Sequence, residues 1–432
     1  FSPSPQQQQQ HFRPNKHRKK QSVLPDFFLL PPLIVSTITF LLTTLFIFIP
    51  STINVFFPIL TYTMIALNGI TCSIVGVGNV ALSRIYPSNM SIAPLMNGLA
   101  IGGLLIAILN FATSAGSKME ETHFWNLYCG AEHDDTDGFT ERREDATMAV
   151  TSTGTKSCDT YTINWGAFAY FISSFVILGV TILCYWVLRK LPITAYYVKL
   201  AQEDCQNERN NDSTTTSTTT TNGNNGDTDN TAVNISTIWN TIKYPTLAIF
   251  FSLLVILTLF PAWTLKLASN SKCTSRNRIH NDLFIPMTII IFNVFDLLGR
   301  IVAGYFYSTF LEDGCNVNVV SKRLFYGSLV MFLFLPLFML CHTSSSSSSF
   351  LQQHHFIIQS DIYTLALLSI MAFANGALLT LSFSHGPRLL PPQKHVQELA
   401  SMIMNFVVAF AALLGSLCSF PYVWIAAFKT SV

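Results

Sequence analysis

Charged residues are scarce in this chain of 432 residues. Asp, Glu, Lys and Arg make up 11% of it, whereas a soluble domain carries about 25%. The formal net charge is only +2, which excludes the strongly basic surface of a nucleic-acid-binding protein. Half of the residues are hydrophobic, 35 of them are Phe, and the mean hydropathy is +0.40. This composition predicts an all-α polytopic membrane protein.

The sequence also lacks the short motifs of the common enzyme classes. It contains no Walker loop, HExxH, CxxC or GxSxG motif. Its nine cysteines are scattered rather than spaced as metal ligands. We therefore expect no catalytic residue, no metal site and no cofactor. Cys129 and Cys158 share one polar loop, where an extracellular location would favour a disulfide. Two free thiols are the alternative.

Long apolar stretches dominate the rest of the chain. Each is long enough to cross a bilayer, or nearly so, as a helix. Nine such spans are predicted, at residues 33–50, 53–82, 91–114, 164–188, 238–265, 283–308, 324–342, 361–384 and 399–428.

Polar segments divide these spans into two groups. Residues 1–32 hold a Gln run and a basic cluster, which predicts a disordered tail. Residues 33–188 contain four spans and are expected to form a first helix bundle. Residues 189–237 form a low-complexity loop rich in Thr and Asn. Residues 238–432 contain five spans and are expected to form a second bundle.

The distribution of Lys and Arg predicts the orientation in the membrane. More of them fall on the side of the N-terminal tail than on the opposite side, and such an excess marks the cytoplasmic side. The tail and the loop 189–237 are therefore predicted to be cytoplasmic and the loop 115–163 extracellular. We expect a multi-pass protein of the plasma membrane.

Two opposite charges interrupt the sixth span. Asp296 and Arg300 are four residues apart, so both side chains lie on one helix face, and Asn293 shares that face. A charge at membrane depth costs ~2.5–3.5 kcal/mol on insertion scales, so it normally has a partner or faces a polar cavity. The pair therefore either contacts a solute or pins two helices together.

Small residues in the third span allow close approach of a neighbour. Gly98 and Gly103 have no side chain, so another helix can pack directly against their backbone. Packing is the simpler interpretation. The functional alternative is that a ligand approaches the backbone at one of these glycines.

Several motifs resemble those of the equilibrative nucleoside transporter family. Phe292-Asn293-x-Phe295-Asp296-x-x-Gly299-Arg300 is similar to the signature of that family's eighth helix. Asn375-Gly376, followed by Gly386-Pro387-Arg388 and Glu398, resembles its tenth and eleventh helices. Ala93-Pro94-Leu95-Met96-Asn97-Gly98 is a weaker match to the start of its fifth helix.

The resemblance implies a fold. Members of the family have eleven helices in a major-facilitator-like arrangement of two bundles. The nine predicted spans correspond to the third to eleventh helices, so the fold is predicted to be truncated from eleven. The chain is then expected to be either an incomplete piece or a divergent member.

The resemblance also implies a function. It points to transport of nucleosides, with nucleobases as a second substrate class, by alternating access in a lipid bilayer. The driving force would be the solute gradient or a coupled proton, for which Asp296 is the candidate carboxylate. The rival hypothesis is a pseudo-transporter that does not transport, or a receptor-like membrane scaffold. The oligomeric state is not predicted.

Roles for individual residues follow from the resemblance. Asp296 and Arg300 are expected to contact ribose hydroxyls, with Asn293 orienting the aspartate. Apolar contacts with the base would come from Phe295 and Met96. The remaining predicted substrate-binding residues are Gly98 and Asn375, although helix capping is the favoured role of Asn375. The residues predicted to serve as a gate or in helix packing are Gly103, Arg388 and Glu398, and a solvated surface is the alternative for the last two.

Overall fold

The computed structural model describes most of the apolar part of the chain. The described residues are 26–46, 56–86, 88–116, 165–200, 203, 235–260, 262–272, 277–312, 317–341, 360–391 and 394–428. The Gln run, the Thr/Asn-rich segment, and Cys129 and Cys158 lie outside these residues, as does nearly all of the predicted extracellular loop.

The described residues are almost entirely helical. Their helices are α1 (Asp26–Phe46), α2 (Phe56–Ile85), α3 (Ser88–Gly116), α5 (Trp165–Lys190), α7 (Ile235–Leu259), α8 (Phe284–Glu312), α9 (Val317–Val330), α10 (Phe334–Phe338), α11 (Asp361–His385) and α12 (Lys394–Phe428), together with short 3-10 turns, η2 (Thr264–Lys266), η3 (Arg278–His280), η4 (Met331–Leu333) and η6 (Gly386–Leu389). Within this part of the chain, nine helical segments are long and apolar enough to cross a membrane. This confirms the predicted all-α polytopic membrane protein, because only helices satisfy every backbone hydrogen bond of such segments in lipid.

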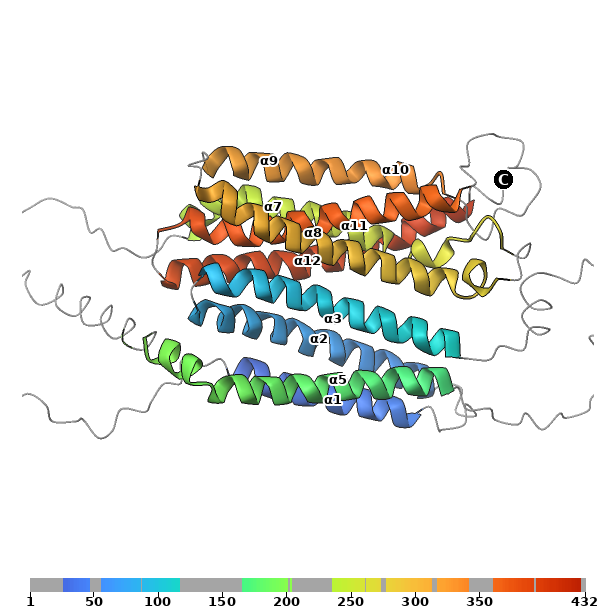
Figure 1. Ribbon diagram of the computed structural model, residues 1–432, viewed down its shortest axis with the longest axis horizontal. Helices are drawn as coiled ribbons and strands as arrows, with labels where there is room; N and C mark the ends of the chain where they lie inside the picture. The colour runs from blue at the N-terminus through green and yellow to red at the C-terminus, as the bar shows by residue number, and fades with distance from the viewer. Residues whose placement is uncertain are drawn as a thin grey trace, which may run out of the picture.

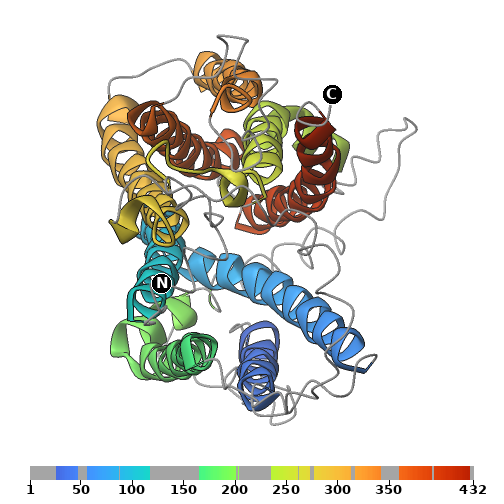
Figure 2. The same cartoon turned by 90° about the vertical axis from the view of Figure 1, so that its right-hand side faces the viewer.

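The helices lie side by side along the long axis of the molecule in two groups (Figure 1). Helices α1, α2, α3 and α5 contact one another, and α7 packs with α9, α11 and α12 in the second group. Figure 2 shows the two groups from one end. Helix α3 is the main link between them, since it packs along α8, while α2 touches α12.

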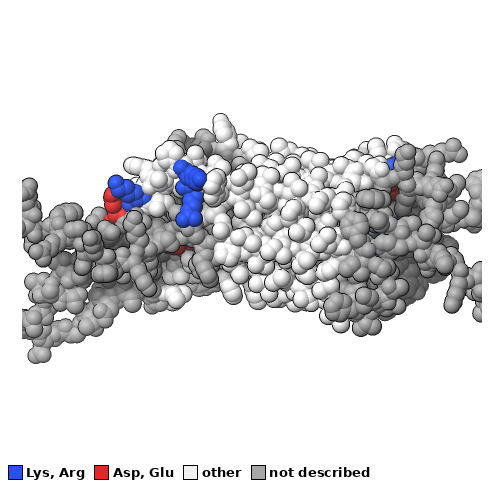
Figure 3. All heavy atoms as spheres, turned by 90° about the horizontal axis from the view of Figure 1, so that it is seen from below, with Lys and Arg blue, Asp and Glu red and all other residues white. Residues whose placement is uncertain are grey.

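Charged side chains are placed as expected for a membrane protein. On the face drawn in Figure 3, Lys and Arg gather towards one end, and the middle shows no charged residue among those described. The end at which α9 and α12 begin carries most of the described cations, namely Arg189, Lys190, Lys199, Lys243, Lys322, Arg323 and Arg388. The orientation in the membrane stays a prediction.

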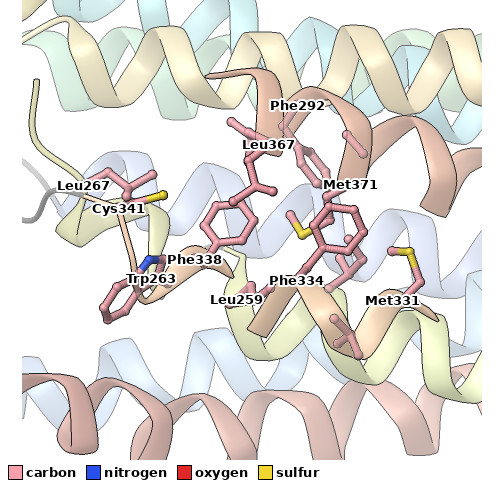
Figure 4. Close-up of a cluster of buried hydrophobic side chains, with 14 of the residues drawn as sticks. Leu259, Trp263, Leu267, Phe292, Met331, Phe334, Phe338, Cys341, Leu367 and Met371 are labelled. Atoms are coloured by element: carbon pink, nitrogen blue, oxygen red, sulfur yellow. The ribbon is translucent and has the colours of Figure 1, made fainter. Parts of the chain in front are cut away.

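A buried apolar cluster fixes the helices of the second group (Figure 4). Phe338, Leu368 and Met371 are completely buried in it. Phe260, just after α7, stacks on Phe292 of α8 with ring centroids 4.1 Å apart. Close packing of this kind leaves α8 and α11 little freedom to shift, so their polar side chains are held at fixed positions.

A second cluster closes the boundary between the two groups at one end. Ile92 and Met96 of α3 are buried against Ile242 of α7 and Phe383 of α11. Met404 of α12 belongs to the same cluster and is completely buried. These residues lie where α3, α7 and α12 begin and α11 ends, so apolar burial holds the two groups together there.

Three predicted boundaries need correction. Helix α1 begins at Asp26, so residues 26–32 do not belong to the tail; Pro31 and Pro32 lie near the helix start, where few backbone bonds are lost. Residues 192–200, predicted as loop, are helical. Pro192 suits the first turn of a helix, and Thr194 joins this segment to Tyr86 through a hydroxyl pair 2.8 Å apart.

The seventh span also starts earlier than predicted. It covers Val317–Phe338 rather than 324–342, and it therefore includes Lys322 and Arg323. Both side chains are exposed. Long basic side chains can lie along an apolar surface and extend their charges towards water, which is why a span can include them near its end.

Two glycines bring α8 and α11 into direct backbone contact. A Cβ atom on Gly299 would overlap the carbonyl of Phe373, and one on Gly376 would overlap the carbonyl of Asp296. Gly299 lies on α8 and faces α11, and Gly376 lies on α11 and faces α8. The approach of the two backbones therefore depends on the absence of both side chains.

We expect Gly299→Ala to destabilise the protein by about 1–3 kcal/mol, because the new methyl group would force α8 and α11 apart. Gly179→Ala on α5 is the matched control, since no heavy atom lies within 4 Å of its added Cβ. Thermal unfolding in detergent should show a lower midpoint only for Gly299→Ala. Equal midpoints for the two variants would contradict this account of the contact.

Candidate functional site

Asp296 lies in the middle of α8 and is 6% exposed. Its Oδ2 accepts a hydrogen bond of 2.8 Å from Nε of Arg300, one turn further along the helix. Its Oδ1 accepts a hydrogen bond of 2.9 Å from Nδ2 of Asn375 on α11. Both carboxylate oxygens are thus paired, which is required of a charge that is buried in an apolar surrounding.

The network extends from this carboxylate in two directions. The Oδ1 of Asn375 accepts a hydrogen bond of 3.0 Å from the hydroxyl of Ser252 on α7. On the other side, Nη1 of Arg300 donates to the carbonyl oxygen of Met96 on α3, over 3.1 Å. Polar contacts therefore join three helices of the second group to one helix of the first.

Local sequence explains why these side chains meet. The i, i+4 spacing of Asp296 and Arg300 brings them together on one face of α8. Gly376 lets α11 approach the backbone of Asp296, and the neighbouring Asn375 then reaches its carboxylate. Ser360 sets the start of α11, because its side chain accepts a hydrogen bond from the backbone N–H of Tyr363.

The ion pair does not use all of its hydrogen-bond donors and acceptors within the described residues. Nη2 of Arg300 donates to no described residue. A guanidinium presents five N–H donors in a plane, and an ionised carboxylate accepts about four hydrogen bonds. The site can thus donate to one group of a small polar molecule and accept from another while the ion pair stays intact.

Asn293 is placed differently from the prediction. It does not bond to Asp296; its Nδ2 donates to the carbonyl of Ile289, over 2.8 Å. Its Oδ1 lies only 2.6 Å from the position that a Cβ on Gly103 of α3 would occupy. The side chain therefore points to the contact between α3 and α8, and Gly103 provides the space for it.

Two further predicted substrate contacts lie apart from the ion pair. Phe295 packs against the buried cluster of the second group, and this disfavours contact with a base. Its position on α8, one residue from Asp296, turns it by about 100° to another face of the helix. Gly98 is exposed, and no heavy atom lies within 4 Å of an added Cβ. Their proposed roles stay predictions.

Asn375 caps no helix end. It lies in the middle of α11, is 4% exposed and connects Ser252 with Asp296. Sequence analysis missed Ser252, although a single hydroxyl within the apolar run Phe250-Phe251-Ser252-Leu253 marks a polar contact inside the protein. Only the tertiary structure identifies its partner.

Of the residues predicted to serve as a gate or in helix packing, Arg388 and Glu398 lie near the end closed by the second apolar cluster. The guanidinium of Arg388 stands 5.1 Å from the ring centre of Tyr307, whose hydroxyl donates to the carbonyl of Ser384. Glu398 is half-buried near the start of α12, where the helix dipole favours a negative charge. His385, to which sequence analysis assigned no role, is buried and bonds to Ser321 over 3.0 Å.

The opposite end holds a second polar link between the groups. Arg278, in the turn before α8, donates to the carbonyl oxygens of Ser114 and Ala115 at the end of α3, both over 3.0 Å. Asp282 accepts from the same guanidinium at 2.6 Å. This hydrogen bond and the negative charge of Asp282 raise the pKa of Arg278 above its ordinary value. The cation therefore neutralises the negative end of the α3 dipole.

Comparison with known proteins gives consistent matches. The family model described as "Nucleoside transporter" matches residues 147–424. Equilibrative nucleoside transporter 1 of Mus musculus is 24% identical over 403 residues, which cover 91% of this chain and 75% of that protein. The rat protein of the same name is 25% identical over 78% of this chain, but the match covers only 63% of its own length. Nucleoside transporter FUN26 of Saccharomyces cerevisiae is 27% identical over 45% of the chain and 35% of its own length.

The polar network predicts a graded loss of stability on substitution. Asp296→Ala leaves Arg300 buried without its anion and should cost about 3–5 kcal/mol, the usual effect of breaking a buried ion pair. Ser252→Ala removes one neutral hydrogen bond and should cost about 1 kcal/mol. The denaturation midpoint in detergent measures both effects.

Thr246→Val is the control, because Thr246 is buried on the same helix as Ser252 and its hydroxyl donates to the carbonyl of Ile242, one turn earlier on that helix, instead of to another helix. The double variant Ser252→Ala, Asn375→Ala should be less destabilised than the sum of its parts. Additive losses would show that Ser252 and Asn375 act independently and would refute the network.

Proposed function

Because this chain belongs to the equilibrative nucleoside transporter family, we propose that it carries nucleosides across a membrane by alternating access. The relatives are named as transporters rather than enzymes, and the chain is a multi-pass membrane protein. The observation that carries the proposal is the position of the Asp296–Arg300 pair, between two helix groups and with donors and acceptors still available.

The chemistry of the pair suits a ribose. Vicinal hydroxyls are both donors and acceptors, so one can donate to the carboxylate of Asp296 while the other accepts from Nη2 of Arg300. The ion pair does not have to break on binding, which avoids the cost of separating two buried charges. Asn375 and Ser252 hold the carboxylate in place from the other side. Met96, whose carbonyl accepts from Arg300, is the neighbouring apolar side chain from α3.

Alternating access requires that the two groups separate at one end at a time. At one end, the apolar cluster around Ile92 and Phe383 joins α3 to α7, α11 and α12. At the other, Arg278 joins the end of α3 to the second group. Either contact can open while the middle of α3, where Gly103 packs against Asn293 of α8, serves as a pivot. The cycle we propose therefore exchanges these two closures.

We propose that the solute gradient alone drives this cycle. Arg300 and Asn375 donate to the two oxygens of Asp296, so the carboxylate already has a cation as its partner. The described residues hold no second carboxylate beside this pair that is bonded to it. Nucleobases lack the ribose hydroxyls that the pair would bind, so we expect nucleosides to be preferred over them.

Uptake of labelled uridine or adenosine tests the function. In cells without their own nucleoside carriers, the chain should raise uptake above background, and Asp296→Ala should abolish it because the hydroxyl acceptor is gone. Arg300→Lys keeps the charge but loses the planar fork, so it should reduce uptake while the protein still reaches the plasma membrane. In proteoliposomes, uptake should not change when a proton gradient is imposed.

Thr288→Val provides the control on the same helix. Thr288 is completely buried in α8 but bonds only to the backbone at Ile285, so its loss should leave uptake unchanged. Surface labelling checks that each variant is present at equal amounts. No uptake by the unaltered protein would favour the rival hypothesis of a membrane scaffold that does not transport. Normal uptake by Asp296→Ala would refute the binding site.

The Arg278 link gives a separate prediction for the closure at its end. Arg278→Gln should release the end of α3, and backbone amides near residues 110–116 and 277–283 should exchange hydrogen faster. Hydrogen-exchange mass spectrometry in detergent measures this directly. Lys266→Gln is the control, because Lys266 is an exposed cation at the same end. Unchanged exchange in both variants would show that the two carbonyl bonds do not hold this end closed.

A further inference from the structure

A groove on the outer side of the second helix group is unconnected with the central ion pair. It has a volume of about 340 Å³. Its walls come from α8 and α9, and α11 forms its floor: the lining residues are Val302, Ala303, Phe306, Tyr307, Val317, Val320, Arg323, Ala377, Leu381 and His385. Helices α8 and α11 pack tightly, whereas α9 leans on α7 (Figures 1 and 2).

The groove is apolar along most of its length and closed at one end. Val302, Phe306 and Val320 are typical of the lining. His385 closes the end of the groove, because its Nε2 lies 3.0 Å from the hydroxyl of Ser321 and 3.1 Å from the carbonyl of Val317. These contacts hold the first turn of α9 against the last residue of α11.

Arg323 places a positive charge at the same end. Its side chain is exposed, and it lines the groove near the start of a membrane span. No described residue forms a salt bridge with it. An apolar groove with a cation at its end is complementary to an amphiphile that has a long hydrocarbon chain and a negative headgroup.

We propose that this groove binds an anionic phospholipid, with one acyl chain along α8 and α11 and the phosphate beside Arg323. The depth of Arg323 supports this arrangement. It lies six residues into the span that begins at Val317, about 9 Å along the helix, so a basic side chain of that length reaches the headgroup level. Lys322 is also exposed, but it does not line the groove. It contributes only to the general attraction of the surface.

Photo-crosslinking tests the proposal. The purified full chain is placed in phosphatidylcholine nanodiscs that contain a phosphatidylserine with a photoreactive acyl chain. Crosslinked peptides are then mapped by mass spectrometry. We expect the label on residues 302–307 and 317–323, and unlabelled phosphatidylserine should compete for it better than phosphatidylcholine does. Arg323→Gln should reduce this preference by about fivefold, the usual effect of one basic residue near an anionic surface.

Neighbouring residues provide matched controls. Lys322→Gln removes an adjacent charge outside the groove, so it should weaken the preference much less than Arg323→Gln does. Val320→Phe fills the groove and should abolish the label, while Val319→Phe adds the same ring at an exposed position of α9 and should not. An equal effect of Arg323→Gln and Lys322→Gln, or of the two Phe variants, would overturn the proposal. So would labels spread evenly over the outer faces of α8 and α9.

Discussion

A buried charge must form its hydrogen bonds inside the protein, and the network around the Asp296–Arg300 pair spans four helices. Asn375 of α11 donates to the aspartate and accepts from Ser252 of α7, and the carbonyl of Met96 on α3 accepts from the arginine. Helix packing holds each partner in place, and the hydrogen bonds in turn fix how the helices pack. The same interaction that satisfies the charges therefore joins the two helix groups, from the middle of α8 to the first part of α3.

Helix α3 carries most of the connection between the groups. Along its length it provides an apolar contact at Ile92, a carbonyl acceptor at Met96, a space for Asn293 at Gly103 and two terminal acceptors for Arg278. These contacts differ in chemistry from one end to the other. Apolar burial at one end and charged hydrogen bonds at the other respond differently to water, which is a physical basis for opening them one at a time. The groove lined by α8, α9 and α11 has another environment, which is apolar along most of its length and has Arg323 at one end.

The errors in the predicted boundaries have a common cause. Hydropathy places charged and proline-containing segments outside a span, but a helix tolerates both near its ends. Lys322 and Arg323 lie within the first two turns of α9, and Pro31 and Pro32 lie near the start of α1. The side chain of Asn293 lies away from Asp296 for a different reason. The i, i+3 spacing to Asp296 was correct, but spacing on one helix does not reveal that a neighbouring glycine offers the side chain another place.

The sequence by itself determined the class of structure. Its low charge and long apolar runs require membrane-spanning helices, because only such runs are long enough to cross a bilayer. The i, i+4 spacing of Asp296 and Arg300 brings the two side chains together on one helix face. Only the tertiary structure decided which distant groups complete the site. Asn375 and Met96 are separated from the ion pair by many residues, and helix packing alone brings them within hydrogen-bond distance of it. The same packing brings Ser252 within hydrogen-bond distance of Asn375. Long-range contacts of this kind depend on how whole helices fit together, which a pattern along one helix does not contain.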